Sequence, residues 1–273
     1  MKYKMATAFR HALEGRLRQQ SLSGGEPLAR LRKMVAFDRF LARVAKKQPD
    51  AWIVKGGFAL QLRLGERART TKDIDVSAVN PWTREQTITH LRAAVLLNLG
   101  NWFEFEVGEP SEAATGAPGR GFRFPMRCLL DGRPFETFHL DVGYGDPVLE
   151  APVELTAPNL LAFAEIAPAK VRCYPLTTQS AEKLHTYTRT YASGETSRTR
   201  DLADILLAGS LAQFDGAKLK QAIDATSHPV PPQMPDPPQR IASSYAQVAR
   251  ELDLPWRTIE EAGAATAQFL DPS

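Results

Sequence analysis

The stretch KGGFALQLRLGERARTTKDIDV, residues 55–76, decides the fold of this chain of 273 residues. It follows an apolar run at residues 52–54, which predicts a short buried strand. Gly56 and Gly57 end that strand, and the apolar spacing over residues 58–64 then predicts a helix. A strand, a glycine turn and a helix therefore follow one another here.

The end of the same stretch predicts a second strand over residues 71–76. Side chains alternate along a strand, so Asp73 and Asp75 share one face while Ile74 and Val76 point into the core. Two neighbouring carboxylates repel each other unless a cation lies between them, and hard oxygen ligands suit a Mg²⁺ ion that also binds substrate phosphates. The pair is a candidate metal site, and a solvated strand end is the alternative.

Gly56 and Gly57 are candidates for binding phosphate. Glycine lets a phosphate approach the backbone, and the N-terminus of a helix offers free N–H groups and the positive end of the helix dipole. The two glycines stand directly before the predicted helix, which fits this role. A tight turn that binds no ligand is the alternative interpretation.

The rest of the first 150 residues predicts a mixed sheet with helices packed on it. Residues 135–142 indicate a strand with His139 and Asp141 on one face and the apolar side chains on the other. Asp141 is a candidate third carboxylate, as a second metal ligand or as the base that accepts a proton from an attacking hydroxyl. The alternative is an ordinary strand-end aspartate before the turn at residues 143–145. The other predicted elements are helices at about 3–20, 28–47 and 83–99 and strands at about 102–107 and 121–130.

Helical patterns dominate beyond residue 150, so we expect two lobes, residues 1–150 and residues 151–273. Residues 228–238 contain six prolines and predict an extended connector. The helices expected in the second lobe lie at about 158–167, 178–192, 200–208, 216–226, 240–252 and 257–270.

The second lobe also carries charged residues at helical spacing. Asp201 and Asp204 are three residues apart on a predicted helix and share a face. Lys183, on the preceding helix, is suited to neutralise a triphosphate, with an aspartate of the next helix holding its side chain in place. An ordinary surface salt bridge, with a contribution under about 1 kcal/mol, is the alternative.

The composition is that of a globular protein, with 43% hydrophobic and 24% charged residues, and it excludes a disordered chain. The sequence has neither a long apolar run that would span a membrane nor the apolar segment of a secretory signal, so we expect a cytoplasmic protein with no membrane partner. Two cysteines, Cys128 and Cys173, exclude a disulfide framework and a cysteine-rich metal site; we expect buried thiols.

The positive charge is concentrated at the start of the chain. Residues 1–50 hold twelve Lys or Arg against four acidic residues, whereas the whole chain carries only +3. Neutralisation of phosphates by such cations drives nonspecific affinity for nucleic acids, so basic N-terminal helices that hold RNA are one interpretation. A solvated helix face without a partner is the other.

Taken together, these motifs resemble the AbiEii/AbiGii-type nucleotidyltransferase toxins of bacterial abortive-infection and toxin-antitoxin systems, and they are similar to the mycobacterial MenT toxins. The matching stretches are residues 55–76, AEKLHTYTR at residues 181–189 and RTRDLADILLA at residues 198–208. The resemblance covers residues 30–210 or so. It implies an α/β (α+β) fold, with a DNA-polymerase-β-like core built on a mixed sheet and a helical C-terminal lobe.

The resemblance also implies roles for the candidate residues. Asp73 and Asp75 would bind Mg²⁺ or Mn²⁺, and Gly56 and Gly57 would grip the triphosphate of an NTP. The activity implied is transfer of a nucleoside monophosphate to an RNA hydroxyl, with the tRNA 3′ acceptor end as the expected acceptor and a cognate antitoxin as a partner. The remaining residues assigned to the site are Lys183, Asp201, Asp204 and Asp141 for catalysis, with Lys55 and Arg69 as further cations against the triphosphate.

One position departs from the family pattern. Ser or Thr often follows the double glycine in such enzymes, whereas this chain has Phe58, so a hydroxyl contact to the triphosphate is missing. Phe58 suggests one alternative, a nucleotide-binding regulator that has lost catalysis. A separate alternative keeps the chemistry and transfers the nucleotide to a protein or small-molecule acceptor.

Overall fold

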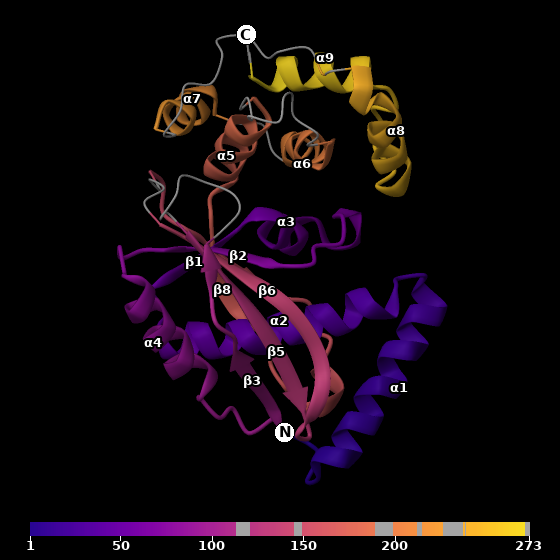
Figure 1. The fold of residues 1–273 in the computed structure, drawn as a ribbon. Coiled ribbons are helices and arrows are strands. Elements are labelled where there is room, and N and C mark those ends of the chain that lie inside the picture. The colour runs from indigo at the N-terminus through magenta and orange to yellow at the C-terminus, as the bar shows by residue number, and fades with distance from the viewer. Residues whose placement is uncertain are drawn as a thin grey trace. The chain divides into compact units, whose positions relative to one another are not determined.

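The computed structural model describes residues 1–112, 121–144, 149–188, 199–211, 215–225, 237 and 239–270 (Figure 1). These residues form nine α-helices and an eight-stranded sheet, which confirms the predicted mixed α/β class. The chain divides into two compact units. Unit 1 comprises Met1–Phe58, Thr70–Gly145 and Glu154–Cys173, and unit 2 comprises Ala59–Arg69, Asp146–Val153 and Tyr174–Ser273. The lobe boundary expected near residue 150 stays a prediction.

The sheet has the strand order β3-β5-β6-β2-β1-β8-β7, with β4 paired to β5. It is mixed, because β1 pairs antiparallel with β2 and parallel with β8, while β2 pairs parallel with β6. The central strands β1, β2 and β6 therefore carry the candidate site. The strands are β1 (Trp52–Lys55), β2 (Ile74–Ala78), β3 (Phe103–Val107), β4 (Ser111–Glu112), β5 (Gly121–Leu130), β6 (Arg133–Tyr144), β7 (Val153–Thr156) and β8 (Lys170–Cys173).

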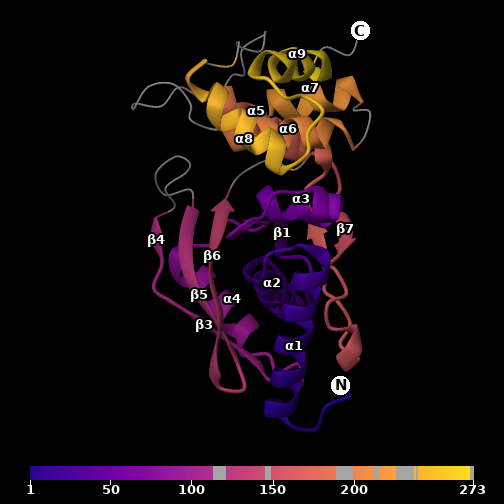
Figure 2. The same cartoon turned by 90° about the vertical axis from the view of Figure 1, so that its right-hand side faces the viewer.

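Helix α2 (Leu28–Lys47) covers one side of the β5–β6 hairpin in unit 1, as Figures 1 and 2 show. Its Phe37 and Phe40 both pack edge-on against Phe138 of β6, with ring centroids 5.0 and 5.7 Å apart. Such aromatic contacts add to the burial of apolar area. The odd-numbered side chains of β5 and β6 near the site consequently point away from α2. Unit 1 also contains α1 (Ala6–Gly24) and α4 (Arg84–Val95).

Helix α4 begins with a capping box formed by Thr83 and Gln86. The Thr83 hydroxyl accepts a hydrogen bond from the Gln86 amide, and the Gln86 side chain accepts one from the Thr83 amide. This capping box satisfies two backbone donors that the first turn leaves without helical partners.

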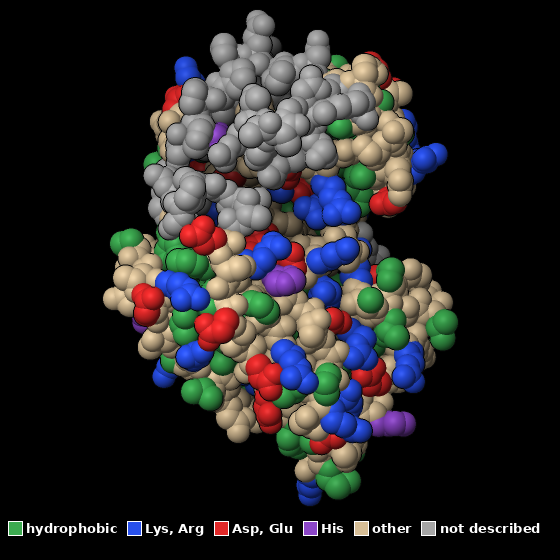
Figure 3. Space-filling model, viewed as in Figure 1, with side chains coloured by type: hydrophobic (Ala, Val, Ile, Leu, Met, Phe, Trp, Pro, Cys, Tyr) green, Lys and Arg blue, Asp and Glu red, His purple; other side chains and the backbone are tan. Residues whose placement is uncertain are grey.

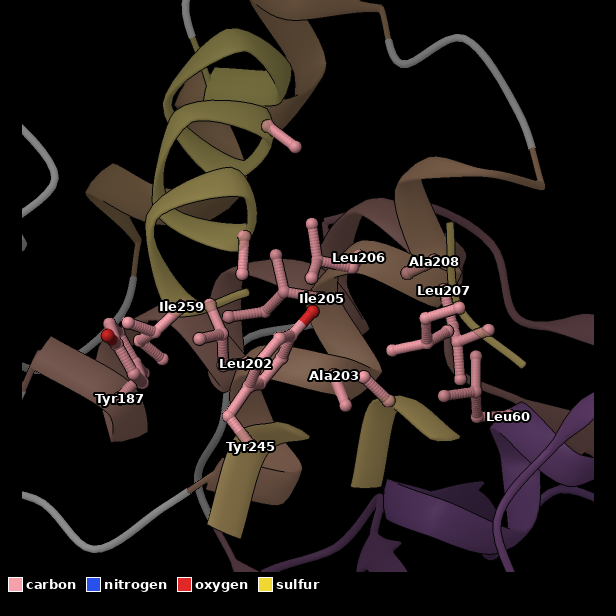
Figure 4. Packing of buried hydrophobic residues seen from close by; sticks show 14 of the residues in the cluster. Leu60, Tyr187, Leu202, Ala203, Ile205, Leu206, Leu207, Ala208, Tyr245 and Ile259 are labelled. Atoms are coloured by element: carbon pink, nitrogen blue, oxygen red, sulfur yellow. The ribbon is translucent and has the colours of Figure 1, made fainter. Parts of the chain in front are cut away.

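Unit 2 is helical, as expected, and α6 (Thr199–Gly209) forms its centre. Figure 4 shows Leu202, Ile205 and Leu206 of α6 packed among Tyr245 and Ile259. All five side chains are at most 3% exposed, and full burial of a Leu or Ile contributes about 2 kcal/mol. The other helices are α3 (Gly56–Leu64), which starts in unit 1, α5 (Leu176–Thr188), α7 (Gly216–Asp224), α8 (Ala242–Glu251) and α9 (Ile259–Leu270).

The prediction of a helix at residues 158–167 is wrong. Only a 3₁₀ turn forms there, at Ala162–Ala164, and Glu165 ends it with a left-handed φ of 58°. Strands β7 and β8 flank this turn, and β8 pairs with β1. That pairing joins segments far apart in the sequence, so local periodicity could not reveal it. Of the proline-rich segment 228–238, all but residue 237 lie outside the described residues.

The remaining expectations concern the thiols and the membrane. Cys128 and Cys173 are both buried thiols that form no disulfide among the described residues, as predicted, and burial raises the pKa of the Cys128 thiol. In the described part of the chain, no helix combines the length and the apolar character that crossing a bilayer requires.

Candidate active site

The turn between β1 and α3 brings the backbone of Gly56 against the carboxylate of Asp75. Lys55 and Asp75 are partners in the antiparallel register of β1 and β2, which places the end of one strand beside the acidic residue of the other. Gly56 then adopts a left-handed φ of 64°. A Cβ atom at this position would overlap Asp75 Oδ2 and lie 2.8 Å from Asp75 Cγ. Glycine is therefore required both by the backbone conformation and by the close approach of the carboxylate.

A further carboxylate, Asp141, lies beside Asp75 on the neighbouring strand β6. Asp75 and Asp141 are register partners in β2 and β6, and adjacent strands are about 4.8 Å apart. Asp73, immediately before β2, accepts hydrogen bonds of 3.3 Å from both the backbone N–H and the ring Nδ1 of His139. The structure thus brings Asp73, Asp75 and Asp141 to one end of β2 and β6, as the strand alternation predicts.

Arg123 of β5 supplies positive charge among these acids. Its guanidinium donates two hydrogen bonds to Asp141, at 2.8 and 2.6 Å, and its Nη2 lies 3.7 Å from Asp73 Oδ2. The hydrogen bond to Asp141 is the main cause that raises the pKa of Arg123 further above its ordinary value, and the Asp73 and Asp75 charges add to it. A fixed cation therefore offsets the mutual repulsion of the carboxylates.

The acidic residues fit a divalent metal ion of the Mg²⁺ type. Among the residues that the structure describes, no group of three His, Cys, Asp or Glu side chains is already arranged as a metal site. Mg²⁺ does not need such a cage, because it keeps several water ligands and is held by one or two carboxylates together with substrate phosphates. Asp73 and Asp75 can provide that pair, and the glycine turn gives the Asp75 carboxylate its space.

The predicted phosphate-binding glycines occupy the first turn of α3. Gly57 follows Gly56 at the N-terminus of this nine-residue helix, where backbone N–H groups lack helical partners. Phe58, the departure from the family pattern, is 1% exposed and packs edge-on against Phe37 at 5.1 Å between ring centroids. Its side chain belongs to the core and anchors the start of the helix, so backbone groups are left to contact a phosphate.

Four charged residues of unit 2, Arg69, Lys183, Asp201 and Asp204, form one largely buried cluster. Lys183 Nζ lies 2.6 Å from Asp201 Oδ1 and 3.0 Å from Asp204 Oδ2. Arg69 holds the other side of Asp204 through two hydrogen bonds, at 3.0 and 2.9 Å. The Asp204 side chain is 1% exposed and that of Lys183 is 17% exposed, so this is not the surface salt bridge considered from the sequence.

Lys183 and Asp204, at the centre of this cluster, both stay ionised. Burial tends to raise the pKa of Asp204, but Lys183 and Arg69 outweigh burial and lower it. Burial likewise tends to lower the pKa of Lys183, and Asp204 and Asp201 outweigh it and raise it. The cluster therefore positions two cationic side chains through two carboxylates.

Sequence patterns missed Arg123 as a member of the acidic site. The strand predicted at residues 121–130 does place Arg123 two residues before Pro125 on the exposed face, and its partner across the hairpin is Asp141. The register of β5 against β6 was needed to bring them together. The twelve basic residues of the first 50 positions were equally ambiguous, because composition does not distinguish cations that face solvent from those that form hydrogen bonds within the fold.

Comparisons with known proteins identify the family of the chain. Residues 39–261 match the family model described as nucleotidyl transferase AbiEii toxin, type IV toxin-antitoxin system. Among solved structures, the chain is similar to MenT4, a nucleotidyltransferase toxin from Mycobacterium tuberculosis H37Rv, with a TM-score of 0.56 and 20% identity over 77% of this chain and 68% of MenT4. This likeness supports the fold.

Two further solved structures are similar to the chain at TM-scores of 0.41 and 0.43. The first is a putative nucleotidyltransferase from H. pylori, with 15% identity over 85% of this chain and 89% of that one. The second is an antigenic nucleotidyltransferase-like protein from Paracoccidioides brasiliensis, with 14% identity over 81% of this chain and 92% of that one. No curated protein sequence matches the chain. The family model spans most of the sequence, and the chain therefore belongs to the AbiEii family of nucleotidyltransferase toxins.

Proposed function

We propose that this nucleotidyltransferase transfers a nucleoside monophosphate from an NTP to a hydroxyl of RNA, at the tRNA 3′ acceptor end, in a reaction that depends on a divalent metal. Membership of the family implies the NTP substrate and an antitoxin partner. The observation that carries the proposal is the contact of the Asp75 carboxylate with Gly56 at the N-terminus of α3. It puts a metal-binding group beside backbone suited to phosphate.

Asp73 and Asp75 would hold the Mg²⁺ or Mn²⁺ ion. The metal would polarise the phosphate oxygens and neutralise the charge that develops on them. The backbone N–H groups at the start of α3, from Gly57 onward, would bind the triphosphate oxygens, with Lys55 as an added cation. Phosphoryl transfer needs little more than such positioning and charge neutralisation.

Asp141 is the proposed base. The RNA 3′-oxygen forms a bond to the α-phosphorus, the bond from that phosphorus to the oxygen bridging to the β-phosphate breaks, and pyrophosphate leaves. The hydroxyl proton passes to Asp141, whose two hydrogen bonds from Arg123 hold it in place as a carboxylate. Asp75 lies beside Asp141 in register, so the proposed metal ligand and the proposed base are neighbours on the sheet.

Lys183 and Arg69 are proposed to counter the charge of the triphosphate. Asp201 and Asp204 fix both side chains through short ion pairs, so little conformational entropy is left to lose when a polyanion binds. Asp204 contacts both cations, so its loss is expected to release both side chains.

The test is incubation of the chain with each α-labelled NTP, Mg²⁺ and total cell RNA, followed by sequencing of the RNA 3′ ends. We expect label in RNA, added at tRNA 3′ ends, and no labelling by Asp73→Ala. Label that enters protein or a small molecule in place of RNA would overturn the assigned acceptor. Label in RNA from Asp73→Ala at the wild-type rate would overturn the metal site.

Gly56→Ala is expected to lower the rate of transfer by about a hundredfold, because the new methyl group would displace the Asp75 carboxylate. The substitution also forces a left-handed conformation on alanine, which costs about 1–2 kcal/mol of stability. Gly132→Ala is the matched control: it has the same φ of 64° and open space around the position of a Cβ atom. It should lose similar stability in a melting curve but keep its activity. Equal activity of the two variants would contradict the role of the contact.

A further inference from the structure

A hollow of about 800 Å³ opens beside Asp73 on the face of the β5–β6 hairpin in unit 1. Its lining includes the cationic or ionisable side chains of Lys33, Lys72, Arg123, Arg127 and His139, against the acids Asp73 and Glu106. Figure 3 views unit 1 from the side of this hairpin and shows Lys and Arg side chains interspersed with Asp and Glu. Such a surface suits an anionic ligand that ends at the acidic site.

We propose that this hollow binds the single-stranded 3′ segment of the RNA acceptor through its phosphates, which leads the terminal hydroxyl to Asp73 and Asp141. The inference rests on the function proposed above and deepens it, because it assigns the surface of the chain that receives the acceptor strand.

The register of β5 and β6 places residues that line the hollow in a row along the hairpin. Arg123 pairs with Asp141, Pro125 with His139 and Arg127 with Thr137. Residues two apart on a strand lie about 7 Å apart on the same face, so the row leads from the carboxylates away along the hairpin in steps that suit the successive phosphates of an extended strand. The row therefore has the carboxylates of the acidic site at one end and the cation Arg127 at the other.

Two cations of the lining, Lys72 beside Asp73 and Arg127 at the far end of the row, are available to a ligand. Lys72 is exposed, and in the part of the chain that the structure describes it forms no ion pair. Arg127 contacts Glu106 at 3.1 Å, but both side chains are about half exposed, at 52% and 53%. Solvent screens such a pair strongly, so a phosphate can replace the carboxylate at little cost.

The N-terminal helices contribute less to this surface than their composition suggests. Arg10 donates hydrogen bonds to the carbonyl oxygens of Leu130, Arg133 and Pro134, and Arg32 contacts Glu14 and the Phe135 carbonyl. Arg39 and Arg43 are 3% and 1% exposed. These four arginines hold unit 1 together, so the RNA contact predicted for the N-terminal helices is reassigned mainly to the hairpin, with Lys33 as the contribution of α2.

The lining also decides what kind of strand fits. Val107 and Pro125 give an apolar surface beside the cations, whereas Met126 and Phe138 are only 2% and 4% exposed. The side chain of His139 is 47% exposed, so stacking of bases is limited to this one ring of the lining and most of the affinity comes from phosphates. We expect binding that tolerates changes in RNA sequence and falls steeply with salt.

The experiment measures binding of a short single-stranded RNA oligonucleotide to the full chain over a series of salt concentrations. Lys72→Ala and Arg127→Ala should each weaken binding about fivefold at low salt and reduce the slope of log affinity against log salt by about 0.7. Lys47→Ala, which removes an exposed cation from the end of α2 outside the lining, is the control and should change neither quantity. Affinity for a fluorescent NTP should be the same in all four proteins.

The outcomes separate this inference from the function on which it rests. If the wild type labels no RNA, the proposed function fails. If the wild type labels RNA but Lys72→Ala and Arg127→Ala bind the oligonucleotide as the wild type does, only the assignment of the hollow fails. Loss of NTP affinity in these variants would assign the hollow to the nucleotide, and tighter binding of duplex RNA or polyglutamate than of the single strand would assign it to another partner; either result overturns the inference.

Discussion

Asp75→Asn is expected to lower kcat/KM for nucleotidyl transfer by about a thousandfold while the chain stays folded. The amide has nearly the shape of the carboxylate, so its contact with Gly56 is preserved, but the negative charge that the proposed metal ion needs is lost. A thousandfold loss corresponds to about 4 kcal/mol of transition-state stabilisation, in the range found for removal of one preorganised electrostatic contact.

The measurement is the initial rate of labelling of RNA over a range of NTP concentrations, with the melting temperature as a check on folding. Asp50→Asn is the matched control, because Asp50 is also in unit 1 and pairs with Arg172 at 3.3 Å, yet its side chain is 91% exposed. It should react as the wild type does. An Asp75→Asn variant whose rate stays within tenfold of the wild type would remove Asp75 from the reaction.

The centre of the fold could be predicted from the sequence because its signals are local. The change from an apolar run to two glycines fixes where β1 ends and α3 begins, and strand alternation alone puts Asp73 and Asp75 on one face. The same alternation correctly placed Asp141 opposite the buried side chains of β6. What these patterns supply is the direction of each side chain within its own element.

Contacts between distant segments could not be predicted in this way. Strand β8 (Lys170–Cys173) lies in the part of the chain beyond residue 150 that was expected to be mainly helical, and no local pattern there indicates its pairing with β1, more than a hundred residues earlier. Arg123 reaches Asp141 only through the register of the β5–β6 hairpin. Likewise, a count of basic residues does not distinguish Arg39 and Arg43 from exposed cations. The packing of the folded chain shows that both are buried.

The ion-pair cluster of unit 2 makes its stability dependent on pH. The pKa of Asp204 is lower in the folded chain than its ordinary value, so the folded state binds fewer protons in acid than the unfolded state does. The stabilisation from this carboxylate is therefore fully present above about pH 4, the ordinary pKa of aspartate, and is lost as the pH falls below it. Replacement of the carboxylate should abolish this part of the acid dependence.

Asp204→Asn is accordingly expected to lower the free energy of unfolding by about 3–5 kcal/mol at neutral pH, because it leaves the buried Lys183 and Arg69 cations without their shared carboxylate. Asp253→Asn is the control: it breaks an ion pair with Arg257 in the same unit, but the Asp253 side chain is 91% exposed, so the loss should stay under about 1 kcal/mol. Urea unfolding of the three proteins at pH 7 and near pH 3 measures both effects. The difference between wild type and Asp204→Asn should shrink in acid, since protonation removes the same charge. A difference that is small at pH 7, or equally large at both pH values, would mean that the carboxylate does not hold the two cations.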